Sequence, residues 1–204
     1  MRIITGSARG ARLLAPKGMT TRPTADRVKE SVFNILGDKV RDQRVLDLFA
    51  GSGALGLESL SRGASHALMV DRDSVGIIAK NAAHTHLEHK AKILDMDVMA
   101  ALSRLEKEEK CFGIIFSDPP YHRGWTEAVL ARITESHLLA ENGILVLEHG
   151  ADEEGFSSET LTCVLSRRYG AVTKVSFFQR ASYLKMRCRT WRLIHDTGSL
   201  HGKF

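Results

Sequence analysis

Hydrophobic and polar positions follow a regular order along most of the chain, and this order predicts strands that alternate with helices. Short apolar runs, each expected to form a strand, lie at 44–49, 66–71, 90–97, 112–118 and 143–150. Segments in which apolar residues recur at helical spacing lie at 53–63, 74–87, 98–108 and 125–136. Several strands are apolar at almost every position, as expected of parallel strands covered by helices on both faces. The pattern therefore predicts an α/β fold with an open, doubly wound sheet.

The two ends of the chain depart from this alternation. The first residues mix short β-like pieces with glycines and arginines, which indicates a small β arm. Residues 22–37 then have helical spacing, with Thr24 as the expected N-cap and Gly37 after the last turn. Beyond the fifth strand we expect a helix near 157–166. A closing β-hairpin is expected from the segments 164–170 and 172–179.

Charge divides the chain in the same way. Residues 1–44 carry ten Lys and Arg against four Asp and Glu, and residues 181–204 carry five against one, whereas the centre is acidic. Basic ends on an acidic body suggest contact with a polyanion such as nucleic acid, although solvated chain ends would have the same composition. We divide the chain into a basic N-terminal arm at 1–21, a main domain at 22–180 and a basic C-terminal extension at 181–204.

Composition narrows the class of protein. A chain that is 43% hydrophobic and 26% charged is typical of a soluble globular protein. It has no apolar run of the ~18 residues that a membrane span needs, and its start lacks the apolar core of a signal peptide. We therefore expect a cytoplasmic protein without membrane contact. The three cysteines form no CxxC motif and the histidines at 84–89 lack further ligands, so we expect no disulfide framework and no metal.

A glycine-rich segment, DLFAGSGALG at 47–56, follows the first central strand and opens a helix. Its glycines have the GxGxxG spacing of a ligand-binding turn, and ligands of open α/β sheets bind beyond the carboxyl ends of the strands. Four successive strands are expected to end in acidic residues, namely Asp47, Asp71, Asp97 and Asp118. This row of acids suits the cationic sulfonium of S-adenosylmethionine better than the phosphates of a dinucleotide.

The sequence FSDPPY at 116–121 ends the fourth strand, because proline cannot donate to a sheet ladder. The turn would hold Asp118 and Tyr121 rigidly at the edge of the sheet. The Asp118 carboxylate and the Pro119 carbonyl are suited to accept both hydrogens of an exocyclic amino group, and Tyr121 to stack on its base, which contributes ~1–3 kcal/mol. The base would first leave its helical stack. Glu148 ends the fifth strand and would line the same edge or act as a cap or surface acid.

Three blocks carry a family resemblance: MRIITG with RG at 9–10, RPTADRVKESVFNIL at 22–36 and RVLDLFAGSGALGLESLSRGA at 44–64. Together with DPPY they resemble the bacterial family that methylates guanine N2 in 16S ribosomal RNA. The resemblance covers about residues 1–180. It implies a class I methyltransferase fold with a seven-stranded sheet whose seventh strand is antiparallel. It also implies S-adenosylmethionine as cofactor and 16S rRNA, in a small-subunit assembly particle, as partner of a monomer.

The resemblance further implies roles for individual residues. The methionine part of the cofactor would lie on Asp47 and on the loop of Phe49, Ala50, Gly51, Ser52 and Gly53. The ribose would lie at Asp71 beside Arg72, and the adenine at Asp97. The guanine would be held by Asp118, Pro119, Pro120 and Tyr121. RNA would be bound by Arg9, Arg12, Arg22, Thr24 and Arg27.

Two other functions fit parts of the pattern. An adenine-N6 DNA methyltransferase would use the same clamp, but the block at 22–36 and the lack of room for a separate DNA-recognition domain favour RNA. An NAD-dependent oxidoreductase, or a nucleotide-binding module without activity, would explain the glycines and Asp71. It would leave the DPPY turn without a purpose.

Overall fold

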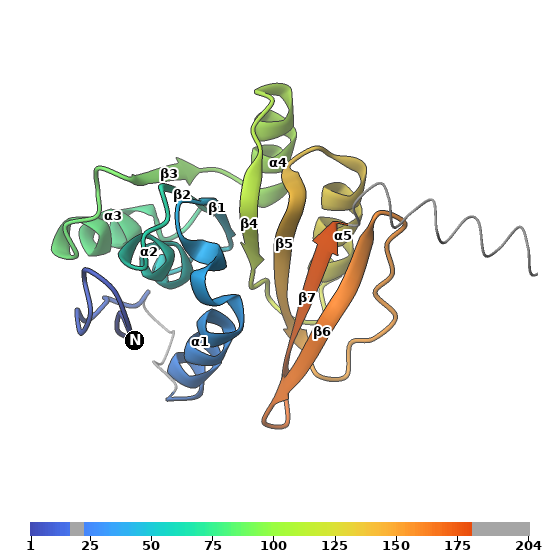
Figure 1. Cartoon of the computed structure of the whole chain (residues 1–204), viewed down its shortest axis with the longest axis horizontal. Helices are drawn as coiled ribbons and strands as arrows, with labels where there is room; N and C mark the ends of the chain where they lie inside the picture. Colours follow the sequence, from blue (N-terminus) through green and yellow to red (C-terminus); the bar gives the residue numbers. More distant parts are fainter. Residues whose placement is uncertain (17–22, 181–204) are drawn as a thin grey trace, which may run out of the picture.

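The computed structural model of the chain describes residues 1–16 and 23–180, and these form one seven-stranded sheet flanked by helices (Figure 1). The strands are β1 (Arg44–Leu48), β2 (His66–Asp71), β3 (Ala91–Asp95), β4 (Phe112–Ser117), β5 (Leu139–Gly150), β6 (Leu161–Tyr169) and β7 (Thr173–Arg180). The helices are α1 (Pro23–Leu36), η1 (Gly37–Val40), α2 (Ala54–Ser61), α3 (Val75–His84), α4 (Val98–Lys107) and α5 (Trp125–Glu135). The predicted α/β class is confirmed.

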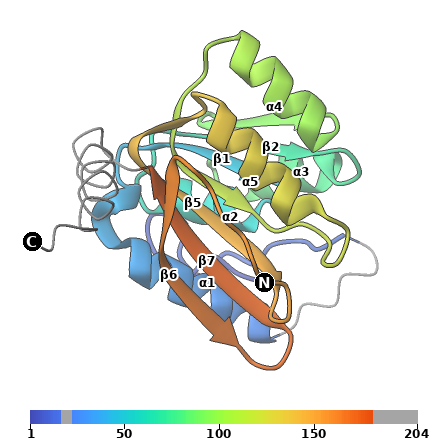
Figure 2. The same ribbon diagram turned by 90° about the vertical axis from the view of Figure 1, so that its right-hand side faces the viewer.

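The strand order β3-β2-β1-β4-β5-β7-β6 places the functional edge of the sheet. β1 pairs in parallel with both β2 and β4, so the chain runs outward to β3 and returns to the other side of β1. The topological switch point therefore lies between β1 and β4, where open α/β sheets bind ligands. β7 is antiparallel to its neighbours β5 and β6, which confirms the predicted antiparallel seventh strand and the closing hairpin. Figure 2 shows this hairpin from the side.

The two faces of the sheet build two cores. One core joins α1, α2, α3 and the N-terminal arm to strand positions such as Val45, Phe116 and Val146. The other joins α4 and α5 to alternate positions such as Leu48 and Leu147. Because side chains of a strand point to opposite faces in turn, the parity of a residue in β4 or β5 decides which helices it meets.

The N-terminal arm is part of the first core. Ile3 and Leu13 are buried there, and the arm closes on itself through an isolated bridge between Arg2 and Arg12. The backbone amide of Ile3 donates to the carbonyl of Ala11 at 2.9 Å. The predicted β arm is therefore confirmed over the described residues 1–16.

Four local predictions differ from the structure. The helix expected near 157–166 is wrong, because residues from Leu161 onward pair with β7 as a strand. β5 begins at Leu139, earlier than expected, because this residue already pairs with Phe112 of β4. α1 begins at Pro23, whose missing N–H suits a first helical position, so Thr24 lies inside the helix and is not its N-cap. The fourth difference, at Asp97, concerns the candidate site. The predicted extension at 181–204 lies outside the described residues.

Within the described ranges, no helix combines the length and the apolar character that crossing a membrane requires.

Candidate active site

A pocket opens at the switch point between β1 and β4. It lies on the face of the sheet that α1 covers, and it brings the glycine loop, the DPPY turn and the end of β5 together. Its lining residues are Met1, Val28, Lys29, Val32, Asp47, Phe49, Ala50, Gly51, Ser52, Ala54, Leu55, Phe116, Ser117, Asp118, Val146, Glu148 and Val175. The sequence-predicted residues Asp47, Phe49, Ala50, Gly51, Ser52 and Asp118 are thus placed around one cavity.

Asp47 lies at the floor of this pocket and is only 1% exposed. Its Oδ2 accepts a hydrogen bond of 2.8 Å from the amide of Gly56, in the first turn of α2. Burial, and to a smaller extent the charge of Asp71, raises the pKa of Asp47 from 3.8 to about 7, although the Gly56 hydrogen bond lowers it. A carboxylate so poorly solvated would be stabilised by a nearby cation.

Glycine at position 56 is required by close packing. A Cβ there would lie 2.7 Å from Cγ and 2.8 Å from Sδ of Met69 in β2, and 3.3 Å from Oδ2 of Asp47. The absence of a side chain therefore lets α2 approach the sheet and present its N-terminal amides to Asp47. This is the third glycine of the predicted GxGxxG pattern, and its role here is helix–sheet contact.

Asp71 ends β2 and holds two loops by hydrogen bonds to backbone amides. Its Oδ2 accepts from Gly51 at 2.8 Å, and its Oδ1 accepts from Asp73 at 2.9 Å and from Ser74 at 2.8 Å. A carboxylate has about four acceptor sites, so these three bonds leave room for about one more donor. The predicted ribose contact at Asp71 stays a prediction, and a ribose would have to share the carboxylate with the Gly51 loop. The neighbouring Arg72 is exposed.

Asp97 lies two residues beyond β3, which ends at Asp95, and so does not end the strand as predicted. Its Oδ1 accepts hydrogen bonds from the amides of Met99 at 2.9 Å and Ala100 at 3.4 Å. Asp97 is therefore the N-cap of α4, because the first amides of a helix lack partners within it. The predicted contact with adenine stays a prediction.

The DPPY turn leaves β4 directly beside the end of β5. Ser117 is paired with Leu147, so the next residues along these parallel strands, Asp118 and Glu148, are neighbours. Asp118 lies two residues after Phe116 and Glu148 two residues after Val146, so both acids lie on the face of the sheet that α1 covers. Both acids line the pocket. Pro119 is buried, whereas Pro120 is exposed. Two acids from adjacent strands thus share one wall of the cavity.

Crowding of these acids changes their ionisation. Desolvation, then the negative charges of Glu148 and Asp47, raises the pKa of Asp118 well above its ordinary value. Asp118 is exposed to solvent and keeps part of its hydration, so desolvation raises its pKa less than it would in a closed site. Repulsion among the three carboxylates raises the pKa of Asp118 even in an open pocket. Desolvation also raises the pKa of Glu148, against a lowering effect of its hydrogen bond with Tyr121.

Tyr121 is held by its hydroxyl. The hydroxyl donates to Oε1 of Glu148 at 2.7 Å and lies 3.2 Å from Oγ1 of Thr173 in β7. Desolvation and the charge of Glu148 raise the pKa of Tyr121, so it is a neutral donor at physiological pH. This arrangement fixes the ring beside the pocket, and its predicted stacking on a base stays a prediction.

Two further aromatic residues meet near the glycine loop. The rings of Phe49 and Trp125 contact edge to face with centroids 5.5 Å apart. Trp125 begins α5, directly after the short segment that contains His122 and Gly124. The amide of His122 donates to Oε1 of Glu153 at 3.2 Å, which ties this segment to the loop after β5.

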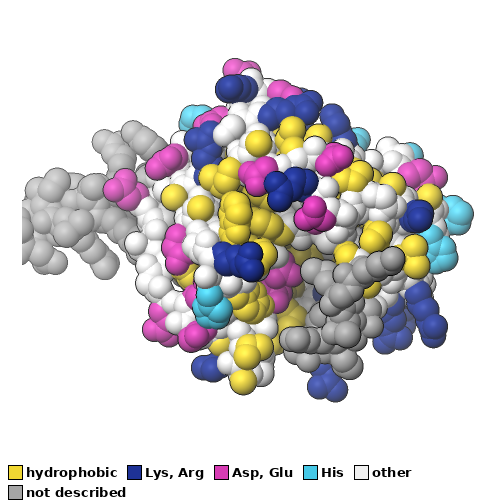
Figure 3. Space-filling view, turned by 180° about the vertical axis from the view of Figure 1, so that it is seen from behind, with side chains coloured by type: hydrophobic (Ala, Val, Ile, Leu, Met, Phe, Trp, Pro, Cys, Tyr) yellow, Lys and Arg dark blue, Asp and Glu magenta, His cyan; other side chains and the backbone are white. Residues whose placement is uncertain are grey.

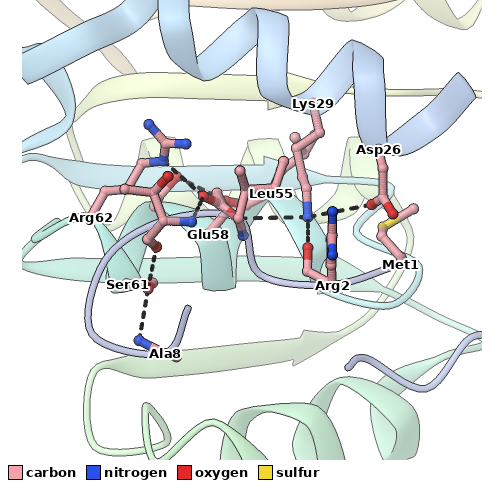
Figure 4. Close-up of polar contacts among 12 residues, drawn as sticks. Met1, Arg2, Ala8, Asp26, Lys29, Leu55, Glu58, Ser61 and Arg62 are labelled. Carbon is pink, nitrogen blue, oxygen red and sulfur yellow. Dashed lines mark hydrogen bonds and ion pairs between the residues drawn. The ribbon is translucent and has the colours of Figure 1, made fainter. Parts of the chain in front are cut away.

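The N-terminal arm reaches the pocket because buried polar groups hold it in place (Figure 4). Glu58 of α2 is fully buried and accepts hydrogen bonds from the amides of Ile4 at 2.7 Å and Thr5 at 3.0 Å. It also pairs with Arg62 at 2.8 Å and with Lys29 of α1 at 3.6 Å. These contacts bring the side chain of Met1 to the pocket wall, beside Lys29.

Most of the predicted RNA-binding residues that can be placed surround a second cavity. Arg9 and Arg27 line it together with Arg2, which was not predicted individually. Arg12 is exposed on the arm. Arg22 lies outside the described residues, as does the side chain of Thr24.

The structure places two residues at the pocket whose role the sequence left open: Glu148, which was expected to line this edge or to act as a cap or surface acid, and Lys29. Glu148 lies near the end of the apolar strand β5, as Asp47 lies near the end of β1, and this position was the available signal. Lys29 lies on the apolar face of α1, 3% exposed, where a lysine is rarely found without partners. Desolvation lowers the pKa of Lys29, and the charges of Glu58 and Asp26 oppose this effect.

The carboxylates that line the pocket suit S-adenosylmethionine as a ligand. Asp47, Asp118 and Glu148 are crowded carboxylates with raised pKa values, which a cationic ligand would stabilise. The described part of the chain contains no group of three His, Cys, Asp or Glu side chains arranged as metal ligands.

Comparison with known proteins identifies the family. A family model described as Conserved hypothetical protein 95 matches residues 1–179. YlbH of Bacillus subtilis (strain 168) is 44% identical over 156 residues, covering 76% of this chain and 85% of the relative. Ribosomal RNA small subunit methyltransferase D of Escherichia coli (strain K12) is 37% identical over 150 residues, covering 72% of this chain and 74% of the relative.

Solved structures agree with this relationship. The structure of yhhF from Escherichia coli is 33% identical, has a TM-score of 0.78, and the match covers 88% of this chain and 97% of that chain. The more distant SMU.776, solved in complex with SAH, is 18% identical with a TM-score of 0.62 over 75% of this chain and 48% of that chain, a likeness of fold alone. By its family model and by these relatives, the chain belongs to the Conserved hypothetical protein 95 family.

Proposed function

We propose that this protein is an S-adenosylmethionine-dependent methyltransferase that modifies the exocyclic N2 amino group of a guanine in 16S ribosomal RNA. The observation that carries the proposal is that Asp118 of the DPPY turn and residues 49–52 of the glycine loop line one pocket. A relative covering most of the chain is named ribosomal RNA small subunit methyltransferase D. The cofactor supplies a methyl group on a positively charged sulfur, which a nitrogen lone pair can attack.

The pocket residues would orient the guanine amino group for this reaction. The lone pair of the amino nitrogen is delocalised into the base, so the group is a poor nucleophile without help. Asp118 and the carbonyl of Pro119 would accept its two hydrogens and favour the positive charge that develops on the nitrogen. The raised pKa of Asp118 also suits it to take the proton that the nitrogen loses.

Asp47 and the loop at 49–53 would hold the methionine part of the cofactor. The buried carboxylate of Asp47 would pair with the methionine amine, while the loop backbone borders the same space. Asp71, with Arg72 beside it, would contact the ribose, and Asp97 would contact the adenine.

RNA would approach over the arm and α1. These two elements form walls of both cavities: Met1 and Lys29 line the acidic pocket, whereas Arg2 and Arg27 line the basic one. Phosphates bound by the arginines would position the strand so that a flipped base enters beside Asp118. In the view of Figure 3, Lys and Arg side chains are scattered over the surface around a central apolar patch.

The substrate that we propose is a partly assembled small subunit, in which the target base is still accessible. Mass spectrometry of ribosomal RNA from cells with and without the protein tests the function, with loss of one N2-methylguanine as the expected result. Purified protein with labelled cofactor should then modify RNA and not duplex DNA. Methylation of adenine in DNA, with ribosomal RNA unchanged, would refute the proposal.

A further inference from the structure

We propose that Glu148 selects guanine among bases that carry a 2-amino group, by accepting the hydrogen on guanine N1. The inference rests on the proposed function and goes beyond it, because holding the reactive amino group is already assigned to Asp118 and Pro119. It concerns the part of the base next to the reacting nitrogen. Four observations carry it.

The first observation is the placement of Glu148. It follows Leu147, the partner of Ser117, so its side chain lies next to that of Asp118 on the neighbouring strand and on the same face of the sheet. Adjacent strands are about 4.8 Å apart. Adjacent donors on one edge of a planar base, such as N1–H and the 2-amino group of guanine, would therefore meet two separate carboxylates.

The second observation is the orientation of Glu148. Oε1 already accepts the Tyr121 hydroxyl at 2.7 Å, and Tyr121 is in turn held by Thr173. Among the described residues, Oε2 accepts no hydrogen bond from the protein. The carboxyl group is thus fixed through one oxygen, while the other is free for a ligand.

The third observation is the shape of the space in front of the acids. Apolar side chains form the pocket walls next to the carboxylates, contributed by α1, β4, β5 and β7: Val28, Val32, Phe116, Val146 and Val175. Apolar walls suit the faces of a purine, and the acids then lie where its polar edge would point. A buried donor or acceptor without a partner would be costly in such a space, which makes the pocket selective.

The fourth observation is the electrostatic cost of the pair. Two carboxylates side by side repel each other, and Asp118 and Glu148 both have raised pKa values. One acid and a carbonyl are enough to bind an amino group alone. A second acid beside the first can hold a second donor of the same base, and guanine N1–H is such a donor.

The chemistry of the bases then gives the selectivity. Guanine presents a 2-amino group and N1–H, both donors. 2-Aminopurine and 2,6-diaminopurine present the same 2-amino group, but their N1 is an acceptor whose lone pair would face the Glu148 carboxylate. A site that bonds a substrate group strongly rejects an analogue lacking it. We expect kcat/KM for guanine to exceed that for either analogue by about 10²-fold.

The test uses the full-length protein and partly assembled small subunits built on ligated 16S rRNA, in which the mapped target guanine is kept or is replaced by 2-aminopurine or 2,6-diaminopurine. Transfer from labelled S-adenosylmethionine gives kcat/KM, and mass spectrometry locates the methyl group. In Glu148→Gln the side-chain oxygen would keep the Tyr121 bond, leaving the amide nitrogen to donate toward N1. The preference for guanine should therefore fall below about threefold or reverse, because the variant binds an N1 acceptor better than a donor.

Two control variants test whether Glu148 selects the base or only supports the structure of the site. Tyr121→Phe removes the hydroxyl that holds Glu148 but keeps the carboxylate, so it should lower overall activity and retain the preference for guanine. Glu154→Gln changes an exposed acid of the loop after β5 and should leave the preference unchanged. Thermal melting and binding of S-adenosylhomocysteine report whether each variant is folded.

The outcomes distinguish the inference from the proposed function. Wild-type protein that methylates guanine and both analogues equally well would overturn the role of Glu148 and leave the function intact. A preference that persists unchanged in Glu148→Gln would also overturn it. Wild-type protein that methylates none of the three bases at N2 would overturn both.

Discussion

The backbone amide of Gly56 donates a 2.8 Å hydrogen bond to Oδ2 of Asp47, a carboxylate that is almost completely buried. One hydrogen bond from a helix terminus replaces only part of the hydration that this group would have in water. The residue is thus kept in a state that costs stability but offers a binding site for a cation. A stability penalty of this kind is expected at functional sites.

Stability should therefore depend on the ionisation of Asp47. Its pKa in the folded protein, about 7, exceeds the ordinary value of 3.8, so the folded state retains a proton that the unfolded chain has lost. The free energy of unfolding should fall as the pH rises through this window. Asp47→Asn keeps the acceptor for Gly56 but does not ionise, and should be more stable than wild type by roughly 1–4 kcal/mol at pH 8. Denaturant melts at pH 5 and pH 8 measure the difference, which should be smaller at pH 5, where only part of the range from 3.8 to about 7 has been crossed.

Exposed Asp73, two residues beyond β2, provides the control. Asp73→Asn should change stability by less than about 0.5 kcal/mol at either pH. Asp47→Asn that is less stable than wild type at pH 8 would contradict the argument.

Cofactor affinity should also depend on the ionisation of Asp47, but for binding the ionised form is the favourable one. The cationic amine of S-adenosylhomocysteine would bind the ionised form of Asp47, which becomes scarce below pH 7. Affinity should fall about tenfold from pH 8 to pH 6. Titration calorimetry measures this, and Asp47→Asn should bind weakly at both pH values. If the affinity of the wild-type protein does not vary with pH, the cofactor amine does not bind Asp47.

Removal of the Asp118 carboxylate should separate chemistry from cofactor binding. In Asp118→Ala the guanine amino group loses one of its two acceptors, and methyl transfer should fall by about 10²–10³-fold or more. Binding of S-adenosylhomocysteine should stay within about threefold of wild type, because Asp47 and the glycine loop remain. Transfer at the wild-type rate would rule out the proposed clamp.

Two ion pairs with the same spacing along their helices should differ sharply in importance. Glu58 of α2 and Arg62, directly after that helix, are 2.8 Å apart, and Glu58 is fully buried. Arg104 of α4 and Glu108, directly after that helix, are 2.7 Å apart on the surface. In Glu58→Ala, Lys29 and two backbone amides of the arm lose their acceptor. The free energy of unfolding should fall by about 3–5 kcal/mol. Glu108→Ala should lower the free energy of unfolding far less, because both side chains of that pair stay in water.

Hydrogen exchange adds a local measurement to this comparison. In Glu58→Ala the amides of Ile4 and Thr5 should lose protection, because Glu58 is their acceptor. If these amides stay protected while global stability falls, Glu58 supports α2 and does not hold the arm.

RNA affinity should depend on the arginines of the basic cavity. Arg9→Ala and Arg27→Ala should each weaken binding and lower the slope of log affinity against log salt by about 1. Filter binding of 16S rRNA over a salt series measures both quantities. Lys107→Ala, an exposed cation at the end of α4, should leave the slope unchanged. Equal effects of all three variants would indicate diffuse attraction without a defined binding face.

The contacts of the N-terminal arm were not predictable from the sequence. The segment was expected from its glycines and arginines, but its partners are Glu58, 54 residues from Ile4, and Asn81, 67 residues from Leu14. Buried Asn81 also donates to the carbonyl of Ser52, so the arm and the glycine loop share one anchor. Nothing local in the sequence marks such pairings.

The alternation of strands and helices, the glycine loop and the rigid DPPY turn could be predicted from residue patterns, because periodicity and turn chemistry act over a few residues. The packed fold was needed to show that Glu148 lies beside Asp118 and that Asp97 caps a helix. It also decided that residues after 161 form an edge strand. Those outcomes depend on strand register and on burial, which are set when distant segments pack and compete for the same partners.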